Sequence, residues 1–115
     1  MTVKELTEQS GFGVLCPGDP EREISKVYCC DMLSIAMGRA PADGAWVTVM
    51  GNVNSVAVGA LADVSCIIFA EGVQPEEACI TRAQQQDICL LATELPVFEA
   101  ALTIHRQLPL GDDAP

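Results

Sequence analysis

The sequence predicts an α/β fold in which helices pack on a mostly parallel sheet of about five strands. Apolar runs of strand length recur about every 20 to 22 residues, and a helical segment follows each run. These runs begin near Ile24, Trp46, Cys66 and Ile88. The two middle runs have no polar alternation, which indicates strands that are buried on both faces, as in a parallel sheet covered by helices.

The amino-terminal residues predict one short helix and two strands. Thr2-Val3-Lys4-Glu5 matches a capping box, in which the threonine and glutamate side chains each satisfy a free backbone amide at a helix start. We expect this helix to end at Gly11. Strands are predicted at Phe12–Cys16 and Ile24–Cys29, and the turn-forming residues 17–20 lie between them.

The next segment predicts a helix and the first strand of a central strand-helix-strand unit. Asp31 is expected to cap a helix over Met32–Met37, and Gly38 is expected to end it in a left-handed conformation. A loop of turn-forming residues follows. Trp46–Met50 is then an apolar run rich in β-branched residues, which predicts a strand.

The central unit continues with a helix and a strand. Gly51-Asn52-Val53-Asn54 is a turn, Ser55–Ala62 has helix length, and Cys66–Phe69 is a continuous apolar strand. Pro75-Glu76-Glu77 then places a proline and two acids in a first helical turn, where fixed φ and the helix dipole favour them. We expect this next helix to end at Gln86.

The carboxyl-terminal residues predict a last strand, a last helix and a tail. The strand is Ile88–Ala92, and the helix begins within Thr93-Glu94-Leu95-Pro96. We expect residues 1–108 to form a single domain. The polar residues 109–115 contain proline and are expected to form a loose tail.

Composition excludes several classes of function. The formal charge of −10, from 16 acidic and 6 basic residues, disfavours nucleic acids and anionic lipids, whose binding requires clustered Lys and Arg. The charge also has a simpler interpretation, because it keeps a chain that is 50% hydrophobic in solution. No apolar run approaches the roughly 18 residues of a membrane span, and the first residues do not resemble a signal peptide. We therefore expect a cytoplasmic protein.

The six cysteines do not have the spacing of a metal site or a disulfide framework. The chain has no C-x-x-C sequence and a single histidine, His105. Cys66, Cys79 and Cys89 lie within predicted strands or helices, where a free thiol behaves as a small hydrophobic side chain. Cys29-Cys30 differs, because neighbouring strand residues point to opposite faces and one thiol can reach the strand end. A redox or metal role for this pair is an open alternative.

Parallel strands joined by right-handed crossovers place their carboxyl ends at one sheet edge, where ligands usually bind. At this edge the most suggestive segment is the turn of residues 51–54, which follows the predicted strand Trp46–Met50. Gly51 allows a close backbone approach, and a helix amino terminus offers free amides to an anion. Asn52 and Asn54 are candidate ligand contacts, or alternatively a turn residue and a helix cap. We identify no catalytic residues, since no nucleophile has a nearby base.

The helix predicted over Ser55–Ala62 has almost no polar face, and such a helix must be covered on more than one side. Gly59 in its middle costs about 1 kcal/mol of helix propensity relative to alanine, which close approach of another backbone would offset. Two arrangements satisfy this requirement. In the first, Val56, Gly59 and Ala60 contact a second subunit of a homodimer. In the second, the whole helix is buried within one subunit.

Residues 21–34, EREISKVYCCDMLS, resemble the motif region of the DRTGG domain family. In that region an acidic residue and arginine precede an apolar residue, a hydroxyl residue and small glycines, and an aspartate-led helix follows. Glu21-Arg22, Ser25 and Asp31-Met32-Leu33-Ser34 match, whereas Lys26-Val27 stand where glycines are expected. The segments AWVTVMGNVNSVAV, CIIFAEGVQPEEA and TELPVFEAA are also similar, so the resemblance spans nearly the whole chain.

The resemblance implies a three-layer α/β/α fold like the amino-terminal domain of HPr kinase. It also implies relatives that are regulatory or dimerising modules beside phosphotransacetylase and CBS-containing pyrophosphatase domains. This chain has no P-loop and is not expected to have kinase activity. We expect no enzyme activity, no cofactor and no bound metal.

Our leading hypothesis is a non-catalytic regulatory domain, a homodimer that binds a small anionic metabolite or nucleotide at the carboxyl edge of the sheet. The candidate ligand contacts are Arg22, Ser25, Lys26, Asp31, Gly51, Asn52 and Asn54. Arg22 and Lys26 favour an anionic ligand, because these two basic residues lie close together in an acidic chain. The alternative is that both side chains are simply solvated. Two other hypotheses are an accessory subunit of a cytoplasmic redox or metabolic complex with no ligand, and a thiol redox or metal module that uses Cys29-Cys30.

Overall fold

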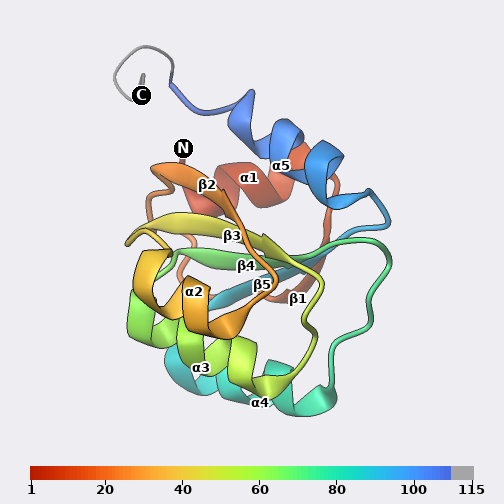
Figure 1. Ribbon diagram of the computed structural model, residues 1–115. Coiled ribbons are helices and arrows are strands. Elements are labelled where there is room, and N and C mark those ends of the chain that lie inside the picture. The colour runs from red at the N-terminus through yellow and green to blue at the C-terminus, as the bar shows by residue number, and fades with distance from the viewer. Residues whose placement is uncertain (110–115) are drawn as a thin grey trace.

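The computed structural model describes residues 1–109 as a five-stranded sheet with helices on both faces (Figure 1). The strands are β1 (Gly13–Cys16), β2 (Lys26–Cys29), β3 (Gly44–Thr48), β4 (Cys66–Phe69) and β5 (Cys89–Ala92). The helices are α1 (Val3–Ser10), α2 (Leu33–Arg39), α3 (Val53–Ala62), α4 (Glu77–Gln86) and α5 (Val97–His105). The sheet order is β1-β5-β4-β3-β2, in which β2 to β5 are parallel and β1 is antiparallel to β5. The predicted α/β fold with a mostly parallel sheet is confirmed.

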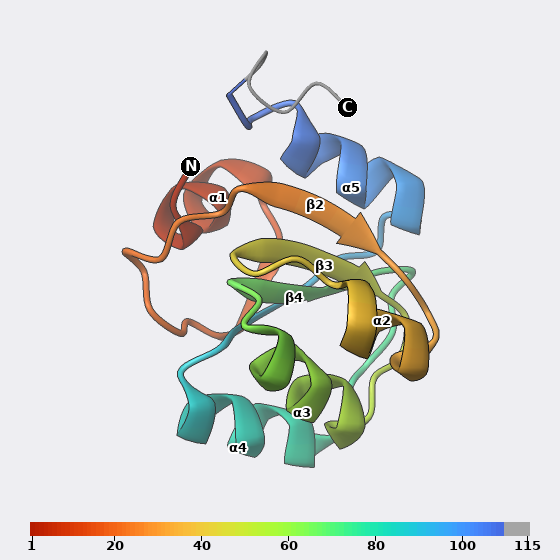
Figure 2. The ribbon, with the colours of Figure 1, turned by 60° about the vertical axis from the view of Figure 1, so that its left-hand side comes forward.

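The helices form two layers around the sheet. Helices α1 and α5 cover one face, and α2, α3 and α4 cover the other (Figures 1 and 2). All five residues of β3 and all four of β4 are buried, as their unbroken apolar sequences predicted. The three-layer α/β/α arrangement implied by the family resemblance is therefore present.

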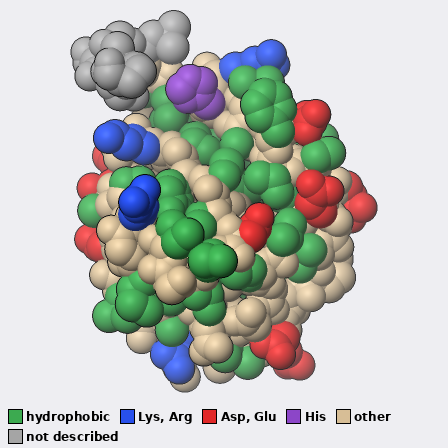
Figure 3. Space-filling model, viewed as in Figure 1, with side chains coloured by type: hydrophobic (Ala, Val, Ile, Leu, Met, Phe, Trp, Pro, Cys, Tyr) green, Lys and Arg blue, Asp and Glu red, His purple; other side chains and the backbone are tan. Residues whose placement is uncertain are grey.

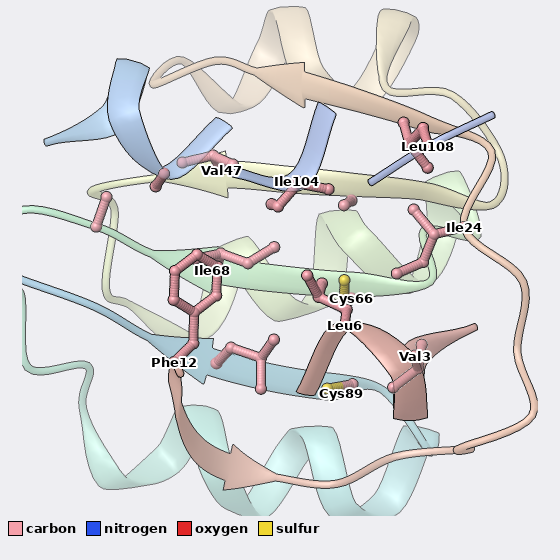
Figure 4. Packing of buried hydrophobic residues seen from close by; sticks show 14 residues of the cluster. Val3, Leu6, Phe12, Ile24, Val47, Cys66, Ile68, Cys89, Ile104 and Leu108 are labelled. Atoms are coloured by element: carbon pink, nitrogen blue, oxygen red, sulfur yellow. The ribbon is translucent and has the colours of Figure 1, made fainter. Parts of the chain in front are cut away.

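Alternate residues of the central strands face opposite layers of the core. On one face Val47 and Ile68 pack beneath Leu6 of α1 and Ile104 of α5 (Figure 4). On the other face Trp46, Ile67 and their neighbours pack against Val56 and Val58 of α3 and against α4. Each central strand thus contributes to two apolar clusters, and burial on both sides holds the sheet between its helices.

The first helix forms as its capping pattern predicted. Thr2 Oγ1 accepts a hydrogen bond from the Glu5 amide at 3.1 Å, and Glu5 Oε1 accepts one from the Thr2 amide at 2.8 Å. The hydrogen bond from the Thr2 backbone lowers the pKa of Glu5, because it stabilises the ionised carboxylate. Gly11 ends the helix with a φ of 76°.

The second helix and the central turn depart from the sequence prediction. Helix α2 begins at Leu33, its cap position is Met32 without a side-chain hydrogen bond, and it continues through Gly38 to Arg39. The prediction that Asp31 caps this helix and Gly38 ends it was therefore wrong. Helix α3 begins at Val53, two residues earlier than predicted.

Several other boundaries shift by a few residues. Strand β3 begins at Gly44 and ends at Thr48, earlier than the predicted Trp46–Met50, and β2 begins at Lys26. The segment before β2 makes different pairings, since the Ile24 amide donates to the Met1 carbonyl at 2.7 Å. The predicted tail, residues 109–115, lies outside the described residues apart from Pro109. Within the part of the chain that is described, no helix is long and apolar enough to span a membrane.

Two glycines provide a matched test of the fold. Gly18 has a φ of 59°, and a Cβ atom there would lie 2.4 Å from the backbone nitrogen of Cys89. We expect Gly18→Ala to lower the free energy of unfolding by about 2 to 4 kcal/mol through backbone strain and overpacking. Gly38 lies in α2 with open space around it, so we expect Gly38→Ala to raise that free energy by about 0.5 to 1 kcal/mol. Urea unfolding followed by circular dichroism measures both changes, and equal stabilities for the two variants would contradict this packing.

Candidate functional site

The carboxyl ends of the parallel strands meet at one edge of the sheet, as the sequence predicted. The registers of β2 to β5 place the loops after Cys29, Thr48, Phe69 and Ala92 side by side. Backbone hydrogen bonds tie these loops together, among them Gly72 amide to Thr93 carbonyl at 3.0 Å. Because β1 runs antiparallel to β5, its amino end also reaches this edge. We call this rim the carboxyl edge.

A hollow of about 370 Å³ lies at the carboxyl edge where β1, β4 and β5 meet. Its lining residues come from the start of β1 and from the loops after β4 and β5: Gly11, Gly13, Gly72, Val73, Gln74, Ala92, Thr93, Glu94 and Leu95. We call it the edge hollow. Glu94 is the charged side chain among these lining residues, and three glycines leave backbone atoms accessible beside it.

A left-handed turn shapes one wall of the edge hollow. Glu71 and Gly72 have φ values of 62° and 73°, so the chain reverses sharply after β4. A Cβ atom on Gly72 would lie 2.9 Å from Glu94 Oε1, so a larger residue would displace this carboxylate, and the positive φ itself favours glycine. Glu71 Oε2 accepts a hydrogen bond from the Val97 amide at 3.0 Å, which satisfies the free amino end of α5.

The amino end of α3, which the sequence analysis assigned to an anion, is occupied by side chains of the protein itself. Asn52 Oδ1 accepts from the Asn54 amide at 3.0 Å, so Asn52 rather than Asn54 is the helix cap. Glu76 Oε1 accepts from the Val53 amide at 3.2 Å. Gly51 lies against the loop before α4, because a Cβ atom there would be 3.0 Å from Pro75 Cα. This turn therefore binds the neighbouring loop.

Asp31 joins the end of β2 to the end of β3. Its Oδ1 atom accepts hydrogen bonds from the Thr48 hydroxyl at 2.8 Å and the Val49 amide at 2.9 Å. The Thr48 hydroxyl is buried, and this bond satisfies it without a ligand. The carboxylate of Asp31 is directed to β3 and not to the start of α2, which is why it does not cap that helix.

The basic residues predicted to share this site lie at the opposite edge of the sheet. Arg22 Nη2 is 2.9 Å from Asp43 Oδ1, 3.0 Å from Asp63 Oδ1 and 2.7 Å from the Asp63 carbonyl. Burial opposes the charge of Arg22, but its hydrogen bonds to the two aspartates outweigh burial and raise its pKa. Ser25 Oγ donates to the Asp43 carbonyl at 3.3 Å, and Lys26 begins β2 at the same end.

The structure therefore does not bring the seven predicted contacts together. Arg22 and Ser25 precede β2 and Lys26 is its first residue, whereas the other four residues follow the carboxyl ends of β2 and β3. A parallel strand carries its two ends to opposite edges of the sheet, so one small ligand cannot contact both groups. The structure thus separates into two groups the residues that the sequence analysis assigned to one site.

The predicted dimer contact on α3 is largely covered by its own subunit. Val56 and Gly59 are buried against β4, and a Cβ atom on Gly59 would lie 2.8 Å from Ile67 Cδ1. The close approach that offsets this glycine comes from a strand of the same chain. Ala60 is partly exposed. Val56 and Gly59 are thus not available to a second subunit, so of the two arrangements considered, burial within one subunit holds for them.

All six cysteines are free thiols, and most of them are buried. Cys16, Cys66, Cys79 and Cys89 are buried, and burial raises the pKa of Cys89 to about 12. Cys29 is exposed, yet partial desolvation and the nearby Asp31 carboxylate raise the pKa of its thiol. Within residues 1–109 no three His, Cys, Asp or Glu side chains are grouped to hold a metal ion.

Comparisons with known proteins agree with this fold. The sequence model of the DRTGG domain matches residues 5–107. A similar solved structure contains the CBS and DRTGG domains of the regulatory region of Clostridium perfringens pyrophosphatase, in complex with the activator diadenosine tetraphosphate. The TM-score is 0.70 at 15% sequence identity, over 95% of this chain and 48% of that chain, so this chain spans about half the length of its structural relative. No curated protein matches the sequence.

The ion pairs of Arg22 predict a structural role for this residue. We expect Arg22→Ala to lower the free energy of unfolding by about 1 to 2 kcal/mol, because Asp43 and the Asp63 carbonyl lose a charged hydrogen-bond donor. Lys26→Ala is the matched control at the same edge, where an exposed side chain should change stability by less than about 0.5 kcal/mol. Urea unfolding of both variants measures the difference. Indistinguishable midpoints would show that the ion pairs contribute nothing.

The raised pKa of Cys29 predicts slow thiol chemistry at neutral pH. Fewer thiols are ionised at pH 7 when the pKa is raised, so a disulfide reagent should modify Cys29 more slowly than it modifies free cysteine. The rate should increase as the pH rises through the thiol pKa. Stopped-flow absorbance measures this rate, and Cys29→Ser should remove the first phase. A rate above that of free cysteine at pH 7 would instead favour a redox role.

Proposed function

This chain belongs to the DRTGG domain family, and we propose that it is a non-catalytic regulatory domain that senses a small ligand in the edge hollow. The edge hollow supports this proposal, because it lies at the sheet edge where α/β folds usually bind ligands. The structural relative comes from a regulatory region and was crystallised with an activator, which supports the same class of function.

The chemistry of the edge hollow favours a ligand part that donates hydrogen bonds. Glu94 lines it, and Glu71 precedes the same turn, whereas Arg22 and Lys26 lie at the other sheet edge. A carboxylate is a common partner of ribose hydroxyl groups, and glycine backbone carbonyls accept further hydrogen bonds. We therefore propose that the sugar and base of a nucleotide enter the edge hollow and that the phosphates point outward to solvent or to a neighbouring domain.

This assignment narrows the class of small anionic ligand that the sequence suggested. The helix amides that would bind a free anion are satisfied by Glu71, Glu76 and Asn52. A phosphate alone would compete with these carboxylates at an acidic rim, which Coulomb repulsion disfavours. An adenine nucleotide is the natural probe, since the structural relative was solved with diadenosine tetraphosphate.

The residues of the edge hollow also favour a role in ligand binding rather than in catalysis. Its hydroxyl group, on Thr93, accepts a hydrogen bond from the Leu95 amide at 3.1 Å and has no histidine beside it. The single histidine, His105, ends α5 at the far edge. A nucleophile needs an adjacent base, so this arrangement favours binding over catalysis.

We propose that the domain works as a homodimer or within a larger assembly. The structural relative joins a DRTGG domain to CBS domains, and this chain covers about half of that length. An accessory subunit with no ligand is the second candidate, and exposed apolar side chains on α2 and α5 favour it. A cytoplasmic location and the relation to HPr kinase stay predictions.

Ligand titration tests the edge hollow. Diadenosine tetraphosphate and adenosine should both raise the melting temperature, and inorganic phosphate should not, because the nucleoside part carries the recognition. Glu94→Gln should weaken binding at least about tenfold in calorimetry, since a charged acceptor of ribose hydroxyls is lost. Lys26→Ala, at the opposite edge, is the matched control and should bind as the wild type does. Stabilisation that phosphate reproduces, or that Glu94→Gln retains in full, would overturn this site.

A further inference from the structure

The two edge strands of the sheet differ in how they are protected from further pairing. Strand β1 has a register irregularity between Val14 and Cys16, and such bulges discourage the addition of another strand. Strand β2 pairs with β3 in unbroken register over all four residues and has no strand on its other side among residues 1–109. An edge of this kind offers a row of backbone donors and acceptors to a partner.

Apolar side chains flank the free edge of β2 on both faces. On the α5 face a shallow groove of about 260 Å³ is lined by Val27, Cys29, Phe98, Ala101, Leu102 and His105. Phe98 is 69% exposed there. On the α2 face Met32 and Met37 are more than half exposed, at 56% and 55%. Figure 3 shows hydrophobic side chains gathered over this side of the molecule, where β2 and α2 lie in front.

We propose that the free edge of β2 pairs with β2 of a second copy of this chain about a two-fold axis, so that two sheets join into one antiparallel seam. This inference rests on the proposed homodimer and names its surface. A two-fold axis makes the same patch serve both partners, and antiparallel pairing places the amino end of one β2 beside the carboxyl end of the other.

Charge and side-chain placement favour this self-pairing over an unrelated partner. Lys26 is exposed at the amino end of β2, and Asp31 is exposed just beyond the carboxyl end. In the antiparallel arrangement each Lys26 approaches the partner's carboxyl end and its Asp31, so opposite charges meet at both ends of the seam. Phe98 of each copy then closes over the apolar groove beside the seam, which removes it from water.

The hydrogen bonds around Cys30 leave the required backbone groups free. The Cys30 amide donates to the Val47 carbonyl at 3.4 Å, so this residue is directed to β3. Residues alternate in direction along a strand, so the backbone groups of Val27 and Cys29 are directed away from β3. These are the groups that would form the first hydrogen bonds of the seam.

Oligomeric state tests the proposal. The full chain should sediment as a dimer of two 12.2 kDa subunits. Phe98→Asp and Cys29→Lys should each raise the dimer dissociation constant at least tenfold, because the first places a charge in the apolar groove and the second places a positive charge beside the partner's Lys26. Leu61→Asp is the matched control, since Leu61 on α3 is 76% exposed and lies beside Arg82 and Gln86 of α4 rather than in the β2 groove. Circular dichroism verifies that each variant folds.

Hydrogen exchange at rising protein concentration provides the second measurement. The amides of β2 should become protected as the dimer forms, and those of the other edge strand, β1, should not. A dimer that both the Phe98 and the Cys29 variants retain would overturn this surface and leave the proposed homodimer standing. A monomer at every concentration would overturn both, while the nucleotide titration tests ligand sensing independently of either result.

Discussion

Hydrogen bonding between four parallel strands, buried on both faces, is the constraint on which the rest of this structure depends. The registers from β2 to β5 fix where each strand ends, and they bring the following loops to one rim. Burial of β3 and β4 between two helical layers leaves these strands no freedom to slip, since a shift of one residue would exchange Trp46 with Val47 between the two cores. The position of every candidate site follows from this arrangement.

At the carboxyl edge the acidic side chains act first as internal hydrogen-bond acceptors. Asp31, Glu71 and Glu76 each accept a hydrogen bond from a backbone amide in a different segment, and each thereby holds two loops together. Glu71, Glu76 and Asn52 occupy amides at the amino ends of α3 and α5 that would otherwise be available to an anion. The edge hollow beside Glu94 is the part of the rim that these contacts leave open. The acidity of the chain thus has a structural use in addition to solubility.

The family, the general fold and most elements were predictable from sequence, whereas the site was only partly so. The common edge was predicted correctly, because parallel strands joined by right-handed crossovers deliver their carboxyl ends to one side of the sheet. The contribution of Gly11 and Gly13 was missed, since nothing local to β1 signals that it adds antiparallel to β5. Arg22 was misassigned because its partners, Asp43 and Asp63, lie 21 and 41 residues away in sequence. An ion pair of that span leaves no local pattern.

The sequence by itself determined the alternation of strands and helices and the burial of both sheet faces, because apolar periodicity and capping residues act within a few positions. Tertiary structure decided which strands lie at the edges, which carboxylates are consumed by loops, and which residues of α3 its own sheet covers. These outcomes depend on contacts between segments far apart in the chain. The carboxylate of Asp31 is chemically suited both to capping a helix and to binding a neighbouring strand. Only the position of Thr48 beside it in the fold makes it bind β3 and not cap α2.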